Sequence, residues 1–390
     1  MHTIDTDSLK IRIETAAHSD IESGRVGGIA TAVMQNGKLC YQGCFGDERL
    51  GIQVSEHTLF RMASMTKPIT AIAVLMLIDQ GKFALDTPVS DILPEFGQMY
   101  VGEIQDGKVK RLKLADSPLT VRNLLTHSSG LGGGEIDHYL NHTFPHAKRI
   151  SIECVVQRLA QMPLDYEPNT AWAYSALHAF DVLARIVEIT SEIPYGSFLK
   201  QNIFDPLEMH DTTFSPTEKQ WAKMIPMHTY EDGIGKIINM PPNNVYEEIP
   251  TTCCCAGAGL ASTLHDYKKF ANMLLNGGMA NGTRFISPRQ FAEFAAPQLS
   301  LSIMDNHIRG EKMPYQSWGL SVRVVTDAAY GTLPCGSFGW SGAYGTHFWV
   351  DPQNQIVAIY LKNSCYPGET ASRFEQAVYS SLNCITQKDY

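Results

Sequence analysis

The 390 residues carry a formal net charge of −9, with 44% hydrophobic and 18% charged residues, a composition typical of a globular protein with a substantial core. Since there is no basic stripe or block of lysine and arginine, the chain lacks the electrostatic footprint of a nucleic-acid-binding protein, and we expect no nucleic-acid partner. The first ten residues are polar, and the longest apolar run, residues 71–78, is too short to span a bilayer, so we expect a cytoplasmic protein without a signal peptide or a membrane partner.

The chain has nine cysteines, an odd number, and three of them are consecutive at Cys253–Cys255. Adjacent cysteines make a poor disulfide framework, so the set favours a reducing compartment. The spacing of Cys40 and Cys44 resembles half of a zinc site, but no second half is evident. If the two lie on a strand they share a face, and packing is the simpler interpretation.

Three histidines, His138, His142 and His146, recur at every fourth residue. This spacing would align them on one face of a helix, where they could bind a metal. Pro145 would interrupt that helix just before the last of them. We therefore predict no metal and no cofactor.

The N-terminal part begins with a predicted helix over residues 8–24, which Gly24 would end. Residues 26–34 and 39–45 follow as two strands. Asn36-Gly37 between them is a typical two-residue hairpin turn. We therefore expect the second strand to pair back on the first.

The stretch from Ser64 to Gln80 predicts a helix that is apolar on all its faces, which is typical of a buried core helix. Pro68 falls in the first turn, where proline is tolerated, and Gly81 gives a stop signal. Ser64 and Lys67 are three residues apart, so they share one face at the start of this helix, with Cβ atoms roughly 5–6 Å apart.

This placement suits a serine nucleophile that is activated by lysine. Burial would lower the pKa of the Lys67 amine and favour its neutral, basic form. The helix N-terminus would favour negative charge that develops near Ser64. A Ser-x-x-Lys spacing also occurs by chance, and the alternative is an ordinary pair of surface side chains, so the other motifs decide between them.

The middle of the chain is mainly helical by its hydrophobic spacing. Residues 97–118 are polar and predict a surface loop or a small hairpin, and the proline-rich residues 226–252 predict a long ordered loop. Thr263 is the expected cap of a helix, with Asp266 completing a capping pair. The predicted helices cover residues 151–161, 176–191, 195–203, 264–275 and 288–295.

The C-terminal part changes to strands, predicted over residues 319–325, 336–340, 346–350 and 356–361, before a final helix at 369–382. Since strands lie at both ends of the chain and helices in the middle, we expect an α/β fold of the α+β type. Residues 1–85 and 310–390 would form one discontinuous sheet domain. Residues 86–309 would form a mainly helical domain with long loops.

Two further segments carry groups that a serine hydrolase needs. Tyr174, in a turn ahead of a helix, could relay a proton, and a cationic lysine beside it would favour its phenolate; the alternative is a tyrosine that anchors a loop by packing. Residues 338–346 are rich in glycine within a strand, which marks the close approach of a backbone or a ligand. The N–H groups of Ala343 and Ser64 could there face an oxyanion, unless the segment is only a bulged core strand.

Five segments match, in order, the motifs of the serine beta-lactamase and penicillin-binding-protein superfamily. The chain resembles most closely its class C-like branch with the family VIII carboxylesterases. Each motif is weak alone, but five in the family's order, from near residue 26 to residue 361, are specific. The matching segments are residues 60–67 (FRMASMTK), 124–131 (LLTHSSGL), 174–176 (YSA), 256–262 (AGAGLAS) and 338–352.

The resemblance implies an antiparallel sheet flanked by helices, an inserted helical domain and an active site in the cleft between them. By position, Ser64 resembles the nucleophile and Lys67 its activating partner. Tyr174 resembles the tyrosine that takes and returns the proton. The N–H groups of Ser64 and Ala343 would form the oxyanion hole.

Two motifs depart from the family pattern. The Y-x-N motif reads Tyr174-Ser175-Ala176, so an amide that usually helps to bind a beta-lactam or a peptide is absent. The K-T-G motif reads Trp340-Ser341-Gly342, and these are the predicted substrate-binding residues. An indole cannot pair with a substrate carboxylate but can pack against an apolar group, and W-x-G resembles the esterase branch.

We therefore expect a serine hydrolase acting through an acyl-enzyme on Ser64, a carboxylesterase on small esters. A beta-lactamase, a D,D-peptidase or a D-amino-acid amidase or aminopeptidase-type amide hydrolase is the alternative, since these share the same serine, lysine and tyrosine. A non-catalytic beta-lactamase-like binding protein is a further alternative. Arg61 and His347 could supply positive charge near the site, but their positions do not follow from the sequence. The only expected partner is a small-molecule ester or amide, and the oligomeric state is open.

Overall fold

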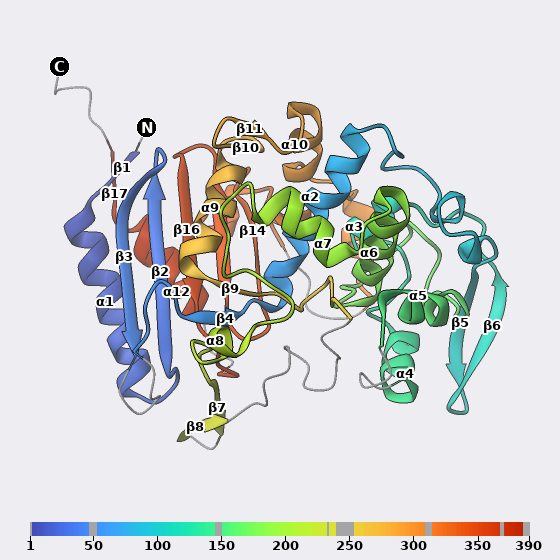
Figure 1. Ribbon diagram of the computed structural model, residues 1–390, viewed down its shortest axis with the longest axis horizontal. Helices are drawn as coiled ribbons and strands as arrows, with labels where there is room; N and C mark the ends of the chain where they lie inside the picture. The colour runs from blue at the N-terminus through green and yellow to red at the C-terminus, as the bar shows by residue number, and fades with distance from the viewer. Residues whose placement is uncertain are drawn as a thin grey trace.

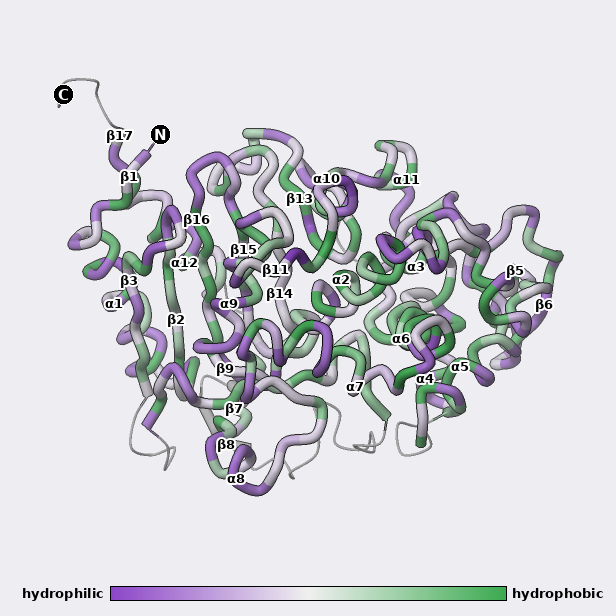
Figure 2. Tube along the Cα trace, turned by 45° about the horizontal axis from the view of Figure 1, so that its top comes forward, coloured by the Kyte–Doolittle hydropathy of each residue, from purple (hydrophilic) through white to green (hydrophobic). Residues whose placement is uncertain are grey.

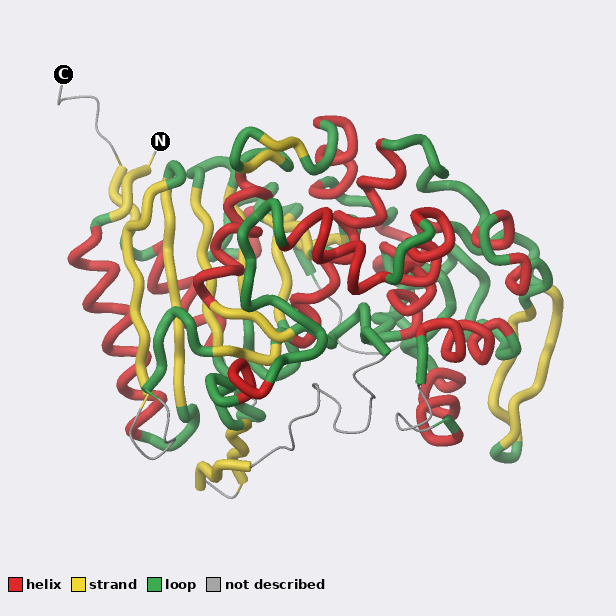
Figure 3. Tube along the Cα trace, viewed as in Figure 1, coloured by secondary structure: helices red, strands yellow, loops and turns green. Residues whose placement is uncertain are grey.

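A seven-stranded antiparallel sheet forms one side of the molecule, as Figures 1 and 3 show. The computed structural model describes residues 2–46, 53–144, 150–231, 234–238, 253–308, 314–366 and 370–384. The order in the sheet is β12-β13-β14-β15-β16-β2-β3, and every neighbouring pair is antiparallel. The strands are β2 (Gly28–Gln35), β3 (Lys38–Gly46), β12 (Gln316–Trp318), β13 (Arg323–Val325), β14 (Phe338–Ser341), β15 (His347–Asp351) and β16 (Ile356–Leu361).

The two ends of the chain meet within this sheet. Strand β16 pairs with β2, with Ile359 opposite Ala32. The β2–β3 hairpin turns at Asn36 and Gly37, whose φ angles are 52° and 71°, as a tight hairpin turn requires. The expected α/β fold with an antiparallel sheet built from both ends is therefore confirmed.

Helices cover both faces of the sheet. Successive residues of β15 point to opposite faces. Trp349 packs against Phe374 of α12 (Thr370–Tyr379), with ring centroids 5.3 Å apart, on the face that α1 (Thr6–Glu22) also covers. Phe348 packs against Tyr267 of α9 (Leu264–Leu275), also at 5.3 Å, on the other face. The sheet is therefore the middle layer between two helical layers (Figure 1).

The middle of the chain forms a helical region beside the sheet (Figure 3). At its far end, residues 97–118 contain the hairpin of β5 (Tyr100–Gln105) and β6 (Lys108–Leu114), which the sequence predicted as one of two possibilities. The helices of this region are α3 (Val121–Leu125), α4 (Glu135–Thr143), α5 (Ile152–Ala160), α6 (His178–Ser191) and α7 (Tyr195–Leu199), while α8 (Glu218–Trp221) lies near the lower end of the sheet in Figure 1, and α10 (Pro288–Ala295) and α11 (Leu301–Asp305) follow later in the chain.

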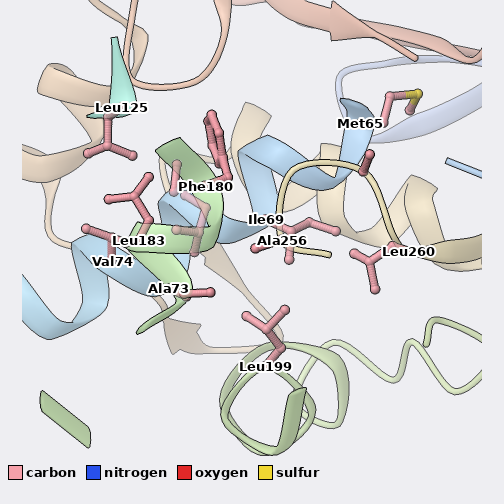
Figure 4. Close-up of a cluster of buried hydrophobic side chains, with 14 of the residues drawn as sticks. Met65, Ile69, Ala73, Val74, Leu125, Phe180, Leu183, Leu199, Ala256 and Leu260 are labelled. Atoms are coloured by element: carbon pink, nitrogen blue, oxygen red, sulfur yellow. The ribbon is translucent and has the colours of Figure 1, made fainter. Parts of the chain in front are cut away.

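Helix α2 (Thr66–Asp79) joins the sheet to the helical region. Every residue from Thr66 to Leu75 is buried, as its all-apolar sequence predicted. It packs against α6, which Figure 2 shows to be largely hydrophobic. Figure 4 shows Val74 beside Leu183 and Phe180 of α6. The start of this helix, which carries Lys67 and directly follows the predicted nucleophile Ser64, is therefore held inside the core.

Several predicted elements differ from the structure. Of the strand expected at 319–325, residues 323–325 form β13, whereas 319–322 form a turn after β12 in which Ser321 has a left-handed φ of 73°. The helix expected at 195–203 changes after Leu199 into a π-helical turn, Lys200–Phe204. Residues 226–252 begin with a hairpin, β7 (Met227–Glu231) and β8 (Ile234–Ile238), and the rest of that predicted loop lies outside the described residues.

The contacts of α9 also differ from the predicted domain division. This helix lies within the range 86–309 that was assigned to the helical domain, but it packs against β2, β15 and β16. Its apolar face, with Tyr267 and Phe270, requires a partner, and the sheet provides it. Thr263 caps the helix by accepting the Asp266 N–H, as predicted, but the Asp266 carboxylate accepts the Asp211 N–H (2.8 Å) instead of completing the capping pair. The division at 85 and 310 otherwise stays a prediction.

Three further pairings of short strands lie outside the seven-stranded sheet. They join β1 (His2–Ile4) with β17 (Leu382–Cys384), β4 (Leu59–Arg61) with β9 (Ala261–Thr263), and β10 (Met279–Ala280) with β11 (Thr283–Arg284), and none of them was predicted from the sequence. Two- and three-residue strands carry too little periodicity to be recognised. Short 3₁₀ helices lie at η2 (Ala63–Met65), η3 (Val89–Asp91), η4 (Pro94–Phe96) and η7 (Ala328–Tyr330).

Among the described residues, no helix combines the length and the apolar character needed to cross a membrane. Eight cysteines, Cys253–Cys255 among them, form no disulfide bond. Cys40 and Cys44 both lie on β3 and are partly buried, but a register shift at Cys40 places them against different core clusters rather than on one face, so packing is their role. His138 and His142 stack on α4 with ring centroids 6.4 Å apart, and His146 lies outside the described residues.

Candidate active site

Ser64 lies in the 3₁₀ helix η2, between β4 and α2. The predicted helix from 64 to 80 therefore starts as a 3₁₀ turn and becomes α-helical at Thr66. Ala63 has a left-handed φ of 48°, a conformation that costs free energy for a residue with a side chain and that often marks a functional site. The Met62 N–H donates to Leu260 O (2.9 Å), so β9 holds the segment that presents Ser64.

Lys67 is fully buried, and its Nζ lies 3.2 Å from Ser64 Oγ. The same Nζ donates to the carbonyl oxygens of Ala176 (2.6 Å) and Gly257 (2.8 Å). Burial lowers the pKa of Lys67 to about 7, although the charges at Cys255 and Asp181 act in the opposite direction. The amine is therefore neutral in a substantial fraction of molecules near pH 7.

The two carbonyl groups orient this amine. A neutral amine has two N–H groups and one lone pair, and a carbonyl oxygen can only accept. When Ala176 and Gly257 take both N–H groups, the lone pair of Lys67 is left for the Ser64 hydroxyl proton. This is the arrangement of a nucleophile beside its general base.

Tyr174 completes this group, as the sequence predicted. Its hydroxyl is hydrogen-bonded to Ser64 and accepts the Trp340 indole N–H at 2.8 Å. Lys67 Nζ lies 4.9 Å from the centroid of the Tyr174 ring. The structure thus brings Ser64, Lys67, Tyr174 and Trp340 together from three separate segments of the chain.

The expected phenolate at Tyr174 is wrong. Burial raises the pKa of this hydroxyl well above its usual value, against the smaller lowering by the hydrogen bonds of Ser64 and Trp340. A nearby lysine favours a phenolate only while it is charged, and Lys67 is itself held near neutrality by burial. Tyr174 is therefore a phenol in the resting site, able to donate its proton.

His127 was quoted in a matching motif but was given no role. It is fully buried with a left-handed φ of 59°, and its Nδ1 accepts the Ser175 N–H at 3.0 Å. Its ring lies 4.5 Å from that of Tyr174. Burial, with a smaller effect of the Lys67 charge, holds the pKa of His127 well below its usual value. This neutral imidazole supports the Tyr174 segment. The only signal for this role in the sequence is the position of His127 directly before Ser128-Ser129-Gly130.

The turn after β14 lies against the Ser64 segment. Thr346 Oγ1 donates to Met62 O at 2.9 Å, and the Gly342 N–H donates to Thr346 O at 2.7 Å. A Cβ on Gly342 would lie 2.4 Å from Met62 O, so only glycine fits there. Within the described residues, the Ala343 N–H has no acceptor. The predicted oxyanion donor is thus available on the turn that touches the nucleophile's segment.

An aromatic wall lies next to these residues. Trp340 meets Trp318 edge to face, with ring centroids 4.5 Å apart, and Tyr174 at 5.3 Å. Trp172, Ile303 and other apolar side chains extend the same cluster. Trp340 therefore belongs to an apolar surface beside the Ser64 group rather than to a cationic one.

The two other candidate cations are buried. Arg61 donates from NH1 to Ile225 O at 3.1 Å. His347 lies between Ser341 Oγ (2.8 Å from Nδ1) and Glu375 Oε1 (2.9 Å from Nε2). Neither therefore replaces the lysine of the K-T-G motif as an open cationic group.

One group among the described residues has ligand atoms close enough for a metal. The side chains of Glu56, His57 and His265 each offer one atom, and all lie within 4.8 Å of one another. The Lys268 ammonium, 2.8 Å from Glu56 Oε2, already neutralises the carboxylate. None of these residues contacts the Ser64 group through a hydrogen bond in the described part of the chain.

Comparisons with known proteins show the family of this chain. The Beta-lactamase family model matches residues 13–379. Protein Rv1367c of Mycobacterium tuberculosis (strain ATCC 25618 / H37Rv) is 31% identical over 363 residues, 88% of this chain and 87% of that protein. Esterase EstB of Burkholderia gladioli is 29% identical over 398 residues, 94% and 93% of the two chains.

Solved structures show the same fold. The structure of "EstCE1, a hydrolase with promiscuous acyltransferase activity" has a TM-score of 0.78 at 22% identity, and the match covers 96% of this chain and 99% of that one. The family model spans both the Ser64 segment and the β14 turn. The chain therefore belongs to the Beta-lactamase family and is a serine hydrolase of the superfamily that beta-lactamases share with penicillin-binding proteins.

Proposed function

We propose that the protein is a carboxylesterase that acts on small esters through an acyl-enzyme on Ser64. The observation that carries this proposal is the buried Lys67, whose pKa is about 7 and whose two N–H groups are taken by carbonyl oxygens. Such an amine is a base at neutral pH with its lone pair directed at the serine hydroxyl. Catalytic groups of this kind work best when their pKa lies near the operating pH.

The reaction has two halves. Ser64 Oγ attacks the ester carbonyl carbon while its proton passes to Lys67 Nζ, and the N–H groups of Ser64 and Ala343 bind the developing oxyanion. The C–O bond to the alcohol breaks, and the alcohol leaves with a proton donated by Tyr174, which Lys67 replaces. Water then attacks the acyl-enzyme by the same route in reverse and releases the carboxylic acid and free Ser64.

The residue at position 340 favours esters over amides that carry a carboxylate. Trp340 supplies an indole and an apolar wall where the family's lysine would pair with a substrate carboxylate. EstB, 29% identical over nearly the whole chain, is named an esterase. Both observations support a neutral ester with an apolar group as the substrate.

An amide hydrolase remains the second candidate because it would use the same Ser64, Lys67 and Tyr174. A beta-lactamase, a D,D-peptidase or a D-amino-acid amidase differs in needing a partner for the substrate carboxylate. A non-catalytic binding protein is the third candidate, which the intact hydrogen-bonded group at Ser64 opposes. For the compartment we propose the cytoplasm, in keeping with the free cysteines.

The test combines labelling and turnover. The purified protein is treated with a fluorophosphonate, its mass is measured, and the labelled peptide is mapped. Untreated protein is assayed separately on p-nitrophenyl esters, nitrocefin and D-amino-acid amides. We expect one adduct on Ser64 and the highest kcat/KM on a short ester. Higher kcat/KM on nitrocefin or an amide would favour the second candidate, and no adduct with no turnover would favour the third.

A further inference from the structure

A chain of hydrogen bonds lies beneath the turn that joins β14 to β15. Ser341 Oγ lies 2.8 Å from His347 Nδ1, and His347 Nε2 lies 2.9 Å from Glu375 Oε1. His347 and Glu375 are 1% and 3% exposed. The three residues come from β14, β15 and α12, so the chain links the turn to the C-terminal helix.

The direction of the hydrogen bond between His347 and Glu375 follows from the charge of Glu375. Burial raises the pKa of its carboxyl group, but the hydrogen bond from His347 and the charge of Arg323, 3.2 Å away, outweigh burial and leave the pKa below its usual value. An ionised carboxylate only accepts, so His347 Nε2 carries the proton. The other ring nitrogen, Nδ1, is the one that bonds with the Ser341 hydroxyl.

This chain holds the base of the turn that carries Ala343. Ser341 and His347 are cross-strand partners at the last pair of the β14–β15 ladder. The other side of the turn is held by the hydrogen bond from Thr346 Oγ1 to Met62 O. Two contacts therefore hold the turn. Glu375 of α12 holds it through His347, and Met62, next to the Ser64 segment, holds it through Thr346.

We propose that His347 and Glu375 are positioning residues for the oxyanion hole, which keep the β14–β15 turn in the place where the Ala343 N–H meets the reacting carbonyl oxygen. The inference rests on the proposed function. A donor to an oxyanion acts only if it is held in place before the charge develops. Since the oxyanion forms in the transition state, a loosened turn should lower kcat and leave KM nearly unchanged.

His347→Phe tests this, because it keeps a ring in the buried site and removes both hydrogen bonds. His347→Asn places an amide where Nδ1 lies and can retain the bond to Ser341. Tyr379→Phe is the matched control: Tyr379 donates to Asp351 Oδ2 at 2.7 Å and so also links α12 to β15, but at the opposite end of the strand from the turn. Each variant is measured for kcat and KM on p-nitrophenyl acetate, for inhibition by phenylboronic acid, and for Tm.

Phenylboronic acid reports on the oxyanion hole, because its adduct with a serine resembles the tetrahedral intermediate. We expect His347→Phe to lower kcat about tenfold or more, a fraction of the 10²–10³ that a lost oxyanion donor costs, with KM within about twofold. Its boronate Ki should rise by the same factor as kcat falls. His347→Asn should recover part of both, and Tyr379→Phe should lower Tm and leave kcat and Ki unchanged.

Equal kcat and Ki in His347→Phe and Tyr379→Phe would overturn the inference and leave the proposed function intact. Full turnover by Ser64→Ala would instead overturn the proposed function. A fluorophosphonate adduct on Ser341 in Ser64→Ala would also overturn the positioning role, because Ser341 would then be a nucleophile itself. If His347→Phe does not fold, Ser341→Ala replaces it, because this variant removes only the hydrogen bond between Ser341 and His347. A fall in kcat with a matching rise in the boronate Ki would then support the inference, and values equal to those of Tyr379→Phe would overturn it.

Discussion

The Nζ of Lys67 lies 3.2 Å from Oγ of Ser64, and both of its other hydrogen bonds go to backbone carbonyl oxygens. No carboxylate accepts from this amine among the described residues, so burial dominates and its pKa falls to about 7. This one relationship decides when the serine can be activated.

The activity should depend on the ionisation of Lys67. The neutral amine is the base, so kcat/KM should rise as pH increases through about 7 and should fall about tenfold for each unit below it. A pH profile on an uncharged p-nitrophenyl ester, with unfolding monitored at each pH, checks this. An inflection close to the ordinary lysine value of 10.5 would show that Lys67 is not the base.

Replacement of Lys67 should remove this base. Lys67→Met is expected to lower kcat/KM by about 10²–10⁴, the scale of general acid–base catalysis. Lys67→Arg should not restore the rate, because a guanidinium stays charged at neutral pH and has no lone pair to offer. Steady-state assays of both variants, with circular dichroism as the folding control, measure this. Wild-type turnover by Lys67→Arg would contradict the role.

Tyr174→Phe should lower kcat by about 10² or more, because it removes the proton donor to the leaving group. The ring contacts with His127 and Trp340 remain, so the fold should be retained. Tyr166→Phe is the control: this buried tyrosine also loses a hydrogen bond, to His127 O at 3.0 Å, but among the described residues it makes no hydrogen bond to Ser64 or Lys67. If the two variants have the same kcat, Tyr174 is only a structural residue.

Trp340→Lys should shift the preference towards amides that bear a carboxylate, because it places a cation where the family's K-T-G motif has one. The ratio of kcat/KM for a carboxylate-bearing amide to that for p-nitrophenyl acetate measures the shift. Trp340→Phe is the control, since it keeps the apolar wall but loses the N–H donated to Tyr174. An unchanged ratio in Trp340→Lys would mean that position 340 does not set specificity.

Gly342→Ala should displace the turn that carries Ala343. The new Cβ would lie 2.4 Å from Met62 O and 2.1 Å from Thr346 Oγ1, so the backbone has to move. We expect a fall in kcat of about 10² with little change in KM, as for loss of an oxyanion donor. Gly97→Ala, where the nearest atom is Pro94 O at 3.1 Å, serves as control and should keep kcat near the wild-type value.

The sequence predicted the elements with strong local signals. The all-apolar pattern of α2, the Asn36-Gly37 turn and the strands β15 and β16 are confirmed because each is set by its own residues. The contact of Ser64 with Lys67 follows from helical spacing. Its contact with Tyr174 came only from the resemblance, since 110 residues separate the two positions in the chain.

What the sequence did not predict depends on burial and on distant segments. The protonated phenol of Tyr174 is set by burial among His127, Trp318 and Trp340, which no local pattern shows. The carboxylate partner of His347 comes from α12, 28 residues further along the chain. The place of α9 on the sheet likewise depends on which surface its apolar face covers.

The most direct test of the central claim is to trap the acyl-enzyme. The protein is mixed with p-nitrophenyl acetate at a pH below 7, where turnover is slow, and is quenched in acid; its intact mass is measured and the modified peptide is sequenced. We predict a mass increase of one acetyl group on Ser64 that disappears in Ser64→Ala together with ester turnover. An acetyl group on another residue, or ester turnover by Ser64→Ala at the wild-type rate, would contradict the account.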